Sequence, residues 1–275
     1  AAGTLGTDAA IVAVDGLHPD GGGPWRLTVE RGGQASRIVL RLVVPGRIGR
    51  ELIITGAAAL RVAEEHGLAA PRLIASDLGG RSTAGVAATL ETALPGSSAL
   101  PGTVTAACLN EAGAAIARVH AIPLEPQADL PLRTRPTQVD DRAMERRWAT
   151  LYQASTDVQK PAVVAALREL TGWGEDTALR VAAGARSTPL LQLADERIRE
   201  IPRPQARTVF VHGDVWWGNM RWDGESCLAL IDWKTAGAGD PGVDLGELRM
   251  QMAIQYGLDA PAHVLDGWER QAGRT

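Results

Sequence analysis

The sequence predicts an α+β protein in which a small, strand-rich amino-terminal domain precedes a larger, mainly helical one. Short apolar stretches with alternating polar residues fill residues 1–95, and this is the period of half-buried strands. From residue 103 onward, apolar residues recur mostly at helical spacing with few interruptions. Between the two patterns lies ALPGSSALPG (93–102), whose Pro, Gly and Ser content is typical of a boundary. We therefore expect two domains, 1–95 and 96–275.

Strands and at least one helix are expected in the first domain. WRLTVE (25–30) alternates apolar and polar residues, and RIVLRLVV (37–44) follows it after the turn-forming Arg-Gly-Gly, so the two predict a hairpin. Residues 49–67 predict a helix that ends at Gly67, since glycine is favoured just after a helix. Two further apolar stretches are PRLIASD (71–77) and GVAATLETAL (85–94).

Helices dominate the second domain, and strand character returns only near its middle. TVFV (208–211) predicts a short buried strand. The segment 219–222, the turn-forming Asp223-Gly224 and CLALI (227–231) together predict a hairpin. Helices are expected over 103–120, 138–153, 157–171, 188–200 and from Val243 to the end.

Composition is that of a globular protein and excludes several classes. The chain has 275 residues, of which 45% are hydrophobic and 22% charged, and its net charge of -4 argues against nucleic-acid binding. No apolar run reaches the roughly 18 residues that span a bilayer, and AAGTLGTDAAIVAVDG lacks the basic start of a signal peptide. Cys108 and Cys227 lie far apart, which argues against a disulfide framework and favours a cytoplasmic protein.

Lysine is rare in this chain. Lys160 and Lys234 are the only lysines, and every other basic side chain is arginine. A P-loop requires lysine directly after the last glycine of GxxxxG, and neither lysine has that context. The P-loop class of nucleotide-binding proteins is therefore excluded.

A pattern of polar residues follows the predicted strand TVFV. This strand delivers Asp214 to its end, a place where active-site groups often lie. Asn219 and Asp232 are at similar distances from the Asp223-Gly224 turn, so hairpin pairing brings their side chains close together. Both offer the hard oxygen ligands that Mg2+ prefers. An acid that can act as a base, beside an oxygen-rich Mg2+ site, is the equipment of phosphoryl transfer.

HGDVWWGN, followed by LIDWKTAGAGDPGVDLGEL, resembles the signature of the aminoglycoside phosphotransferase and choline kinase family. The match is specific because it joins two separated motifs with the right residues and gap. LHPDGGGPWRLTVERGG is similar to the family's nucleotide loop, RIVLRL to its phosphate-pairing strand, and TLETALPG to its hinge. The resemblance covers most of the chain and implies a bilobal, protein-kinase-like fold with a nucleotide-binding lobe over 1–95 and a catalytic lobe over 96–275.

The resemblance also implies roles for single residues. Asp214 is the base that deprotonates the acceptor hydroxyl, while Asn219 and Asp232 hold Mg2+ on the nucleotide phosphates. Arg41 contacts the α- and β-phosphates, and His212 shapes the loop by hydrogen bonding. The other expected nucleotide-binding positions are Gly22 and Gly23 in the loop, and Glu91, Thr92 and Ala93 along the adenine edge.

The sequence departs from the family pattern at two places. Arg41 stands where lysine is typical, and it brings a fork of donors in place of a point charge. Gly56 stands four residues before Leu60, where the family usually has the glutamate that pairs with the phosphate-binding residue. Glu51, Glu64 and Glu65 are candidates for the missing partner.

The expected function is an ATP- or GTP-dependent kinase that uses Mg2+ and phosphorylates a small-molecule hydroxyl. Candidate acceptors are aminoglycosides or other antibiotics, amino alcohols and sugars, with neither nucleic acid nor membrane as a partner and a monomer or homodimer as the assembly. One of Trp216 and Trp217 is expected to face the acceptor and the other the core. Asp240 and Asp244 are first interpreted as helix N-caps. The alternatives are a pseudokinase that binds nucleotide without efficient transfer, and a metal-dependent hydrolase.

Overall fold

The computed structural model describes residues 5–6, 8–18, 23–42, 47–83, 85–135, 143–184, 188–202 and 207–273. The chain forms two compact units. The first takes in Ala1–Val43, Leu52–Arg135 and Ala206–Thr275, and the second takes in Val44–Glu51 and Pro136–Gln205. Both predicted domains contribute to the first unit, and the division at residue 95 stays a prediction.

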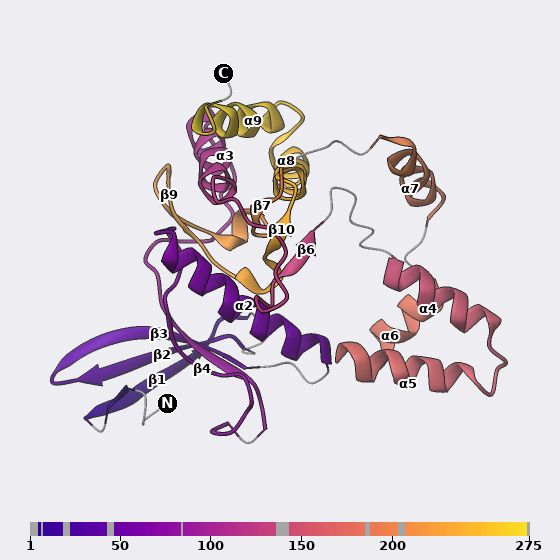
Figure 1. Cartoon of the computed structure of the whole chain (residues 1–275), viewed down its shortest axis with the longest axis horizontal. Helices are drawn as coiled ribbons and strands as arrows, with labels where there is room; N and C mark the ends of the chain where they lie inside the picture. Colours follow the sequence, from indigo (N-terminus) through magenta and orange to yellow (C-terminus); the bar gives the residue numbers. More distant parts are fainter. Residues whose placement is uncertain are drawn as a thin grey trace. The chain divides into compact units, whose positions relative to one another are not determined.

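A five-stranded antiparallel sheet opens the first unit, with the strand order β1-β2-β3-β5-β4 (Figure 1). The predicted hairpin is β2–β3, and its turn carries Gly32 and Gly33 at φ 56° and 77°, a conformation that glycine adopts without strain. Apolar side chains of alternate positions meet on one face, where Leu27 and Val29 pack with Ile38 and Leu90. The strands are β1 (Ala9–Gly16), β2 (Trp25–Arg31), β3 (Gln34–Leu42), β4 (Leu73–Asp77) and β5 (Ala88–Thr92).

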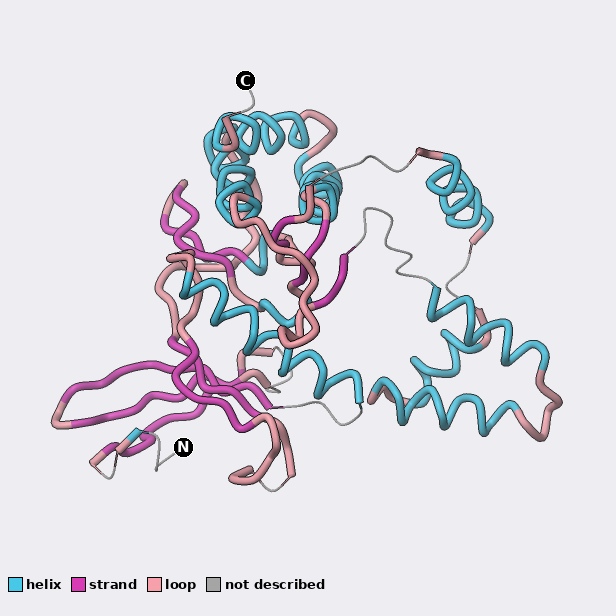
Figure 2. The backbone as a smooth tube through the Cα atoms, in the orientation of Figure 1, coloured by secondary structure: helices cyan, strands magenta, loops and turns pink. Residues whose placement is uncertain are grey.

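Helix α2 (Arg47–Glu65) lies between β3 and β4 in the sequence, as predicted (Figure 2). Its buried face carries Ala59, Leu60 and Val62, which belong to the main hydrophobic core. The helix ends before Gly67, which has φ 65°, and the N–H of Leu68 donates to the carbonyl of Ala63. This is the glycine-terminated helix end that the sequence indicated.

Beyond this sheet and α2, the first unit contains the helices α3 (Ala106–His120), α8 (Gly242–Tyr256) and α9 (Ala260–Gln271). Helices α3 and α9 run side by side (Figure 1). Gly113 of α3 faces the backbone of Val264, and Gly267 of α9 faces the backbone of Asn110. A Cβ atom at either glycine would overlap the opposite backbone, so both residues permit the close approach of the helices.

Short strands lie among these helices. β6 (Arg133–Arg135), β10 (Gly237–Gly239) and β7 (Val209–Val211) form one sheet, while β8 (Met220–Asp223) and β9 (Ser226–Leu230) form the predicted hairpin. Single 3-10 turns, η1 (Trp217–Asn219) and η2 (Trp233–Thr235), flank the hairpin. Asn219 therefore belongs to η1, one residue before the strand in which it was expected. β6 and β10 were not predicted because they are three residues long and carry no apolar alternation.

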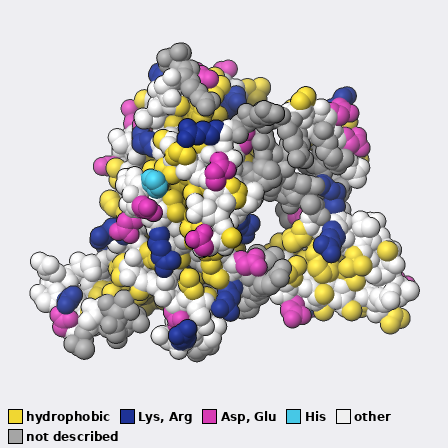
Figure 3. Space-filling view, in the orientation of Figure 1, with side chains coloured by type: hydrophobic (Ala, Val, Ile, Leu, Met, Phe, Trp, Pro, Cys, Tyr) yellow, Lys and Arg dark blue, Asp and Glu magenta, His cyan; other side chains and the backbone are white. Residues whose placement is uncertain are grey.

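The second unit contains α4 (Ala143–Ala154), α5 (Lys160–Thr171), α6 (Glu175–Ala182) and α7 (Pro189–Glu200). Val164, Leu167, Ala178 and Val181 form its small core. Apolar side chains also reach the surface of this unit (Figure 3). Its exposed large apolar residues include Leu151, Val158 and Leu179. The helices predicted over 157–171 and 188–200 are present, as is the part from Ala143 onward of the helix predicted over 138–153, whose residues 138–142 lie outside the described residues. Helix α6 was not predicted. Among the described residues, no helix combines the length and apolarity of a membrane span.

Candidate active site

Asp214 stands at the end of a buried strand, as the sequence predicted. Strand β7 is fully buried and runs into His212 and Gly213, and Gly213 has φ 77°. The turn at Gly213 brings the Asp214 carboxylate to the surface, where its side chain is 30% exposed. A hydrophobic strand thus fixes the start of a polar loop, and Asp214 is the first acidic side chain beyond it.

The loop backbone before Asp214 is held by the buried carboxylate of Asp244. The N–H groups of His212 and Gly213 each donate to Asp244 at 2.7 Å, and Nε2 of His120 lies 3.0 Å from the same carboxylate. Burial alone would raise the pKa of Asp244, but the hydrogen bonds from His120 and from the Gly213 backbone bring it below its ordinary value. The N-cap of α8 is Pro241, so the interpretation of Asp244 as an N-cap was wrong, and the role of this residue was missed.

His212 joins this loop to the segment that carries Asp232. Its ring is fully buried, and Nε2 donates to the carbonyl of Ile231 at 2.9 Å. Burial lowers the pKa of His212 below its ordinary value, so the ring is neutral near pH 7. A neutral, buried ring that binds a backbone carbonyl positions the loop, as expected from the sequence.

The buried imidazole predicts a loss of stability in mild acid. The pKa of His212 is lower in the folded chain than the ~6.5 of an unfolded one, so the unfolded state takes up a proton first as the pH falls. Stability from this group is present above about pH 6.5 and is lost below it, by up to about 1.4 kcal/mol per pH unit. Urea unfolding of the wild type and of His212→Gln measures this slope. Equal slopes in both proteins below about pH 6.5 would contradict the assignment.

Asp232 has an unusual backbone conformation that presents its side chain to the site. Its φ is 67°, and among the described residues no other non-glycine residue has a positive φ. The adjacent Trp233 is buried, stacks on Phe210 at 5.3 Å and donates from Nε1 to the carbonyl of Leu230 at 3.0 Å. The strained backbone at Asp232 is therefore held by an anchored indole, which is typical of functional positions.

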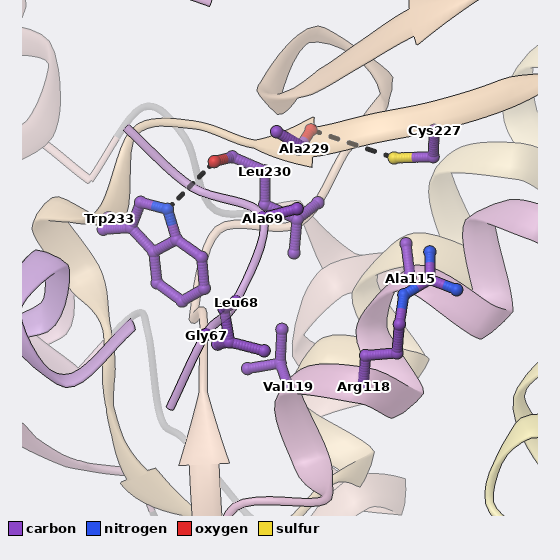
Figure 4. A pocket seen from close by; sticks show the side chains of 10 residues that line it. All are labelled: Gly67, Leu68, Ala69, Ala115, Arg118, Val119, Cys227, Ala229, Leu230 and Trp233. Carbon is purple, nitrogen blue, oxygen red and sulfur yellow. Dashed lines mark hydrogen bonds between the residues drawn. The ribbon is translucent and has the colours of Figure 1, made fainter. Parts of the chain in front are cut away.

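A cavity of about 160 Å³ borders the indole of Trp233. Figure 4 shows that the indole of Trp233 and the side chains of Leu68 and Val119 line this cavity. Cys227 also lines the cavity, and burial raises the pKa of its thiol to about 12, so this cysteine is uncharged. The cavity wall is mostly apolar.

Asn219 lies beside Asp214, and the β8–β9 hairpin pairs it with Ile231, the residue before Asp232. The N–H of Ile231 donates to the backbone carbonyl of Asn219 at 2.9 Å, which extends the hairpin pairing to the residue before Asp232. The Asn219 amide nitrogen donates to the backbone carbonyl of Asp214 at 2.8 Å. Because the amide nitrogen is turned toward this carbonyl, the amide oxygen of Asn219 points away from the backbone of Asp214.

Arg41 on β3 joins the sheet to the Asp232 turn. Its Nε donates to Glu91 at 3.1 Å, and its Nη1 donates to Asp232 at 3.0 Å. Burial alone would lower the pKa of Arg41, but the two carboxylates hold it above its ordinary value. Burial likewise acts to raise the pKa of Asp232, and the charges of Arg41 and Lys234 bring it below its ordinary value. The guanidinium is therefore a fixed positive charge between two carboxylates.

The partner of Arg41 is Glu91, which sequence reasoning placed along the adenine edge. The Glu91 side chain is 7% exposed and also accepts a hydrogen bond from the hydroxyl of Thr89 at 3.1 Å. Gly56 of α2 faces the backbone of Lys234, where a Cβ atom would lie 3.6 Å from its Cα. Arg41 thus pairs with a glutamate on β5, a position that helix spacing could not indicate.

Lys234 belongs to the site, although the sequence motifs did not indicate it. Its Nζ donates to the carboxylate of Asp214 at 3.3 Å and also forms an ion pair with Asp232. Its rarity in the chain and its place two residues after Asp232 were the available signals. Ion pairs and hydrogen bonds now connect Glu91, Arg41, Asp232, Lys234 and Asp214 in that order.

The remaining predicted positions lie at the edges of this cluster. Gly22 is outside the described residues, whereas Gly23 precedes Trp25, which pairs with Leu40 at the same end of the sheet as Arg41. The N–H groups of Thr92 and Ala93 already donate to the carbonyls of Arg72 and Arg37. An adenine contact at Thr92 or Ala93 would therefore use their carbonyl oxygens.

The two tryptophans of the loop have different environments. Trp217 is buried, stacks on Trp222 at 4.3 Å and donates to the carbonyl of Ala99 at 3.0 Å. Trp216 is 43% exposed, and its ring covers Gly218, where no side chain would fit. Trp217 is thus the core residue of the pair, and Trp216 is the one available to a ligand.

Comparison with known proteins gives one family and a set of related folds. The profile of a family described as "Phosphotransferase enzyme family" matches residues 17–275. No curated protein matches the chain.

Among solved structures, the macrolide 2'-phosphotransferase MphH from Brachybacterium faecium is 18% identical, with a TM-score of 0.56 over 98% of this chain and 79% of that one. The aminoglycoside phosphotransferase APH(3'')-Id from Streptomyces rimosus, in complex with ADP and streptomycin, is 17% identical, with a TM-score of 0.55 over 99% and 90%. The type VIII aminoglycoside-3'-phosphotransferase is 20% identical, with a TM-score of 0.54 over 96% and 86%. At these identities the likeness shows the fold, which confirms the predicted α+β, protein-kinase-like class.

Proposed function

The chain belongs to the phosphotransferase enzyme family, and from this we propose that it transfers the γ-phosphoryl group of ATP to a hydroxyl group of a small molecule. The observation that carries the proposal is the cluster of Arg41, Asp232, Lys234 and Asp214, which joins the sheet to the loop through charged contacts. Phosphoryl transfer depends mainly on positioning and on charge stabilisation, and such a cluster can supply both.

The nucleotide would lie against the end of the sheet that carries Arg41. A guanidinium offers five donors in a planar fork, and Arg41 uses Nε and one Nη1 hydrogen on the two carboxylates. Donors remain for phosphate oxygens, and the fixed charge would bind the α- and β-phosphates. The loop between β1 and β2, which includes Gly23, ends at the same edge of the sheet.

Asn219 and Asp232 fit a magnesium ion bound together with the nucleotide. The Asn219 nitrogen is held by the carbonyl of Asp214, which leaves its oxygen as a hard ligand beside a carboxylate that is 19% exposed. Among the described residues no three His, Cys, Asp or Glu side chains form a metal cage of their own. Mg2+ is commonly held by one or two protein ligands plus phosphates. When bound, it would neutralise charge on the phosphates.

Asp214 would act as the base. As the acceptor oxygen forms its bond to the γ-phosphorus, the bond from that phosphorus to the oxygen of ADP breaks, and the hydroxyl proton passes to the Asp214 carboxylate. The rigid loop below it, held by Asp244 and His212, would keep this carboxylate at the acceptor. The carboxylate is partly exposed, so an acceptor can reach it.

The acceptor class is proposed from Trp216 and from the related proteins. An exposed indole two residues after the base offers a flat surface to a sugar ring or a cationic group. Related structures are named for macrolide and aminoglycoside phosphotransfer. We therefore favour amine-bearing glycosides and macrolides as the first acceptors to test.

A coupled ADP-release assay over aminoglycosides, macrolides, amino alcohols and sugars tests the proposal. At least one acceptor should stimulate ADP release by the wild type and not by Asp214→Ala, and mass spectrometry should find that acceptor heavier by one phosphoryl group. Nucleotide binding without transfer to any acceptor would indicate a binding module. Acceptor turnover that needs no nucleotide would indicate a hydrolase.

Glu91→Gln should weaken nucleotide binding, because Glu91 orients Arg41 and balances its buried charge. The KM for ATP is expected to rise about tenfold, with a smaller change in kcat. Glu111→Gln is the matched control, since Glu111 pairs with Arg118 in a more exposed ion pair away from the site. An ATP KM within about twofold of the wild-type value would contradict the role assigned to Glu91.

A further inference from the structure

The site contains a lysine ammonium between the two carboxylates that the proposed chemistry uses. Nζ of Lys234 lies 3.3 Å from Oδ2 of Asp214 and pairs with Oδ2 of Asp232. Lys234 lies on η2, directly after the strained residue Asp232 and the anchored Trp233. Its side chain is 37% exposed, so the ammonium stands at the mouth of the site and not in the core.

The carboxylate of Asp232 is already surrounded by positive charge. Oδ1 accepts from Nη1 of Arg41, and Oδ2 accepts from Nζ of Lys234. A carboxylate has about four lone-pair positions. Two of them are filled, and a divalent ion placed between Asp232 and Asp214 would have to lie where Nζ lies, whereas the remaining positions of Asp232 can still bind an ion elsewhere.

Gly56 of α2 lies beside the backbone of Lys234. The α2 backbone at Gly56 contacts the backbone of Lys234, with a Cβ position 3.6 Å from its Cα. Glycine supplies no side chain there, so α2 offers no carboxylate from this position. The charge of Lys234 is instead satisfied by Asp214 and Asp232.

We propose that the Lys234 ammonium is a fixed cation of the active site that takes the place of one of the two divalent ions bound by protein kinases, so that this enzyme uses a single Mg2+ per nucleotide. The proposal rests on the phosphotransferase function proposed above. Lys234 acts on the reaction through Asp214 and Asp232, which makes it a positioning residue.

Counting bound ions tests the proposal without any acceptor. The full chain is titrated with Mn2+, used in place of Mg2+, in the presence of a non-hydrolysable ATP analogue. Electron paramagnetic resonance measures the Mn2+ that stays free. The wild type should bind one Mn2+ per chain, Lys234→Met should bind two, and Lys234→Arg should return to one. In a turnover assay, Lys234→Met should need about tenfold more free Mg2+ than the wild type.

Lys160→Met is the matched control, because Lys160 lies on α5 in the second unit and pairs with the exposed Asp157. It should bind one Mn2+, like the wild type. Two Mn2+ ions on the wild type would overturn the inference even if Lys234→Met failed to fold, and so would a single ion on a folded Lys234→Met. If Mn2+ binds with the nucleotide but in a number other than the one expected, the single-ion inference fails and the proposed phosphotransferase function stands. If the wild type binds no Mn2+ with the nucleotide, both the inference and the proposed function fail.

Discussion

Asp214→Asn is expected to lower kcat by about 1,000-fold, with little change in nucleotide affinity. Asparagine has nearly the same shape as aspartate but cannot take a proton from the acceptor hydroxyl. The interactions that orient the loop involve the backbone carbonyl of Asp214 and the N–H groups of its two predecessors, so they survive the substitution. The loss should therefore appear in the chemical step and not in the fold.

Single-turnover phosphoryl transfer and nucleotide binding, measured on the same preparation, separate these effects. Asp223→Asn is the matched control, since Asp223 is an exposed aspartate at the end of β8 and should leave both measurements unchanged. A kcat within about tenfold of the wild-type value would mean that Asp214 is not the base. Lost nucleotide binding in Asp214→Asn would instead assign Asp214 to the nucleotide site.

The site residues that the sequence could predict belong to segments whose structure is set by neighbouring residues. Asp214, Asn219 and Asp232 lie near one strand, one loop and one hairpin. The turn at Gly224 and the register shift between Arg221 and Trp222 together bring Asn219 opposite Ile231. The hairpin β2–β3 and the end of α2 were likewise visible as alternation and as glycine positions. Their periods and turn residues are properties of neighbouring residues, which is why the fold class followed from the sequence.

The contacts that complete the site are long-range. Arg41 meets Glu91 because β3 and β5 are neighbours in the sheet, although 50 positions separate the two residues. Asp244 reaches a loop 31 positions earlier by starting α8 beneath it. Neither pairing has a local pattern, and a buried carboxylate in the first turn of a helix has the same sequence appearance as a helix cap.

Asp244→Asn should cause the largest loss of stability among the substitutions considered for this chain. Three donors converge on the Asp244 carboxylate: the N–H groups of His212 and Gly213, and Nε2 of His120, whose Nδ1 accepts from Trp268. Since His120 receives that N–H at Nδ1, its own proton lies on Nε2. The amide of asparagine would turn an NH2 group toward one of these donors. Breaking a buried, charged network of this kind costs about 3–5 kcal/mol.

This cost should lower the melting temperature by roughly 6–10 °C, because a chain of this size loses about 2 °C per kcal/mol. Differential scanning calorimetry measures it, and Asp259→Asn is the control, since Asp259 is exposed before α9 and its side chain makes no cap hydrogen bond. His120→Gln keeps a donor for Asp244 while changing the ring, so it should be less destabilising than Asp244→Asn. If Asp244→Asn melts within about 2 °C of the wild type, the loop is held by something other than this carboxylate. A folded Asp244→Asn should still lose turnover, because the same N–H contacts place Asp214 at the acceptor.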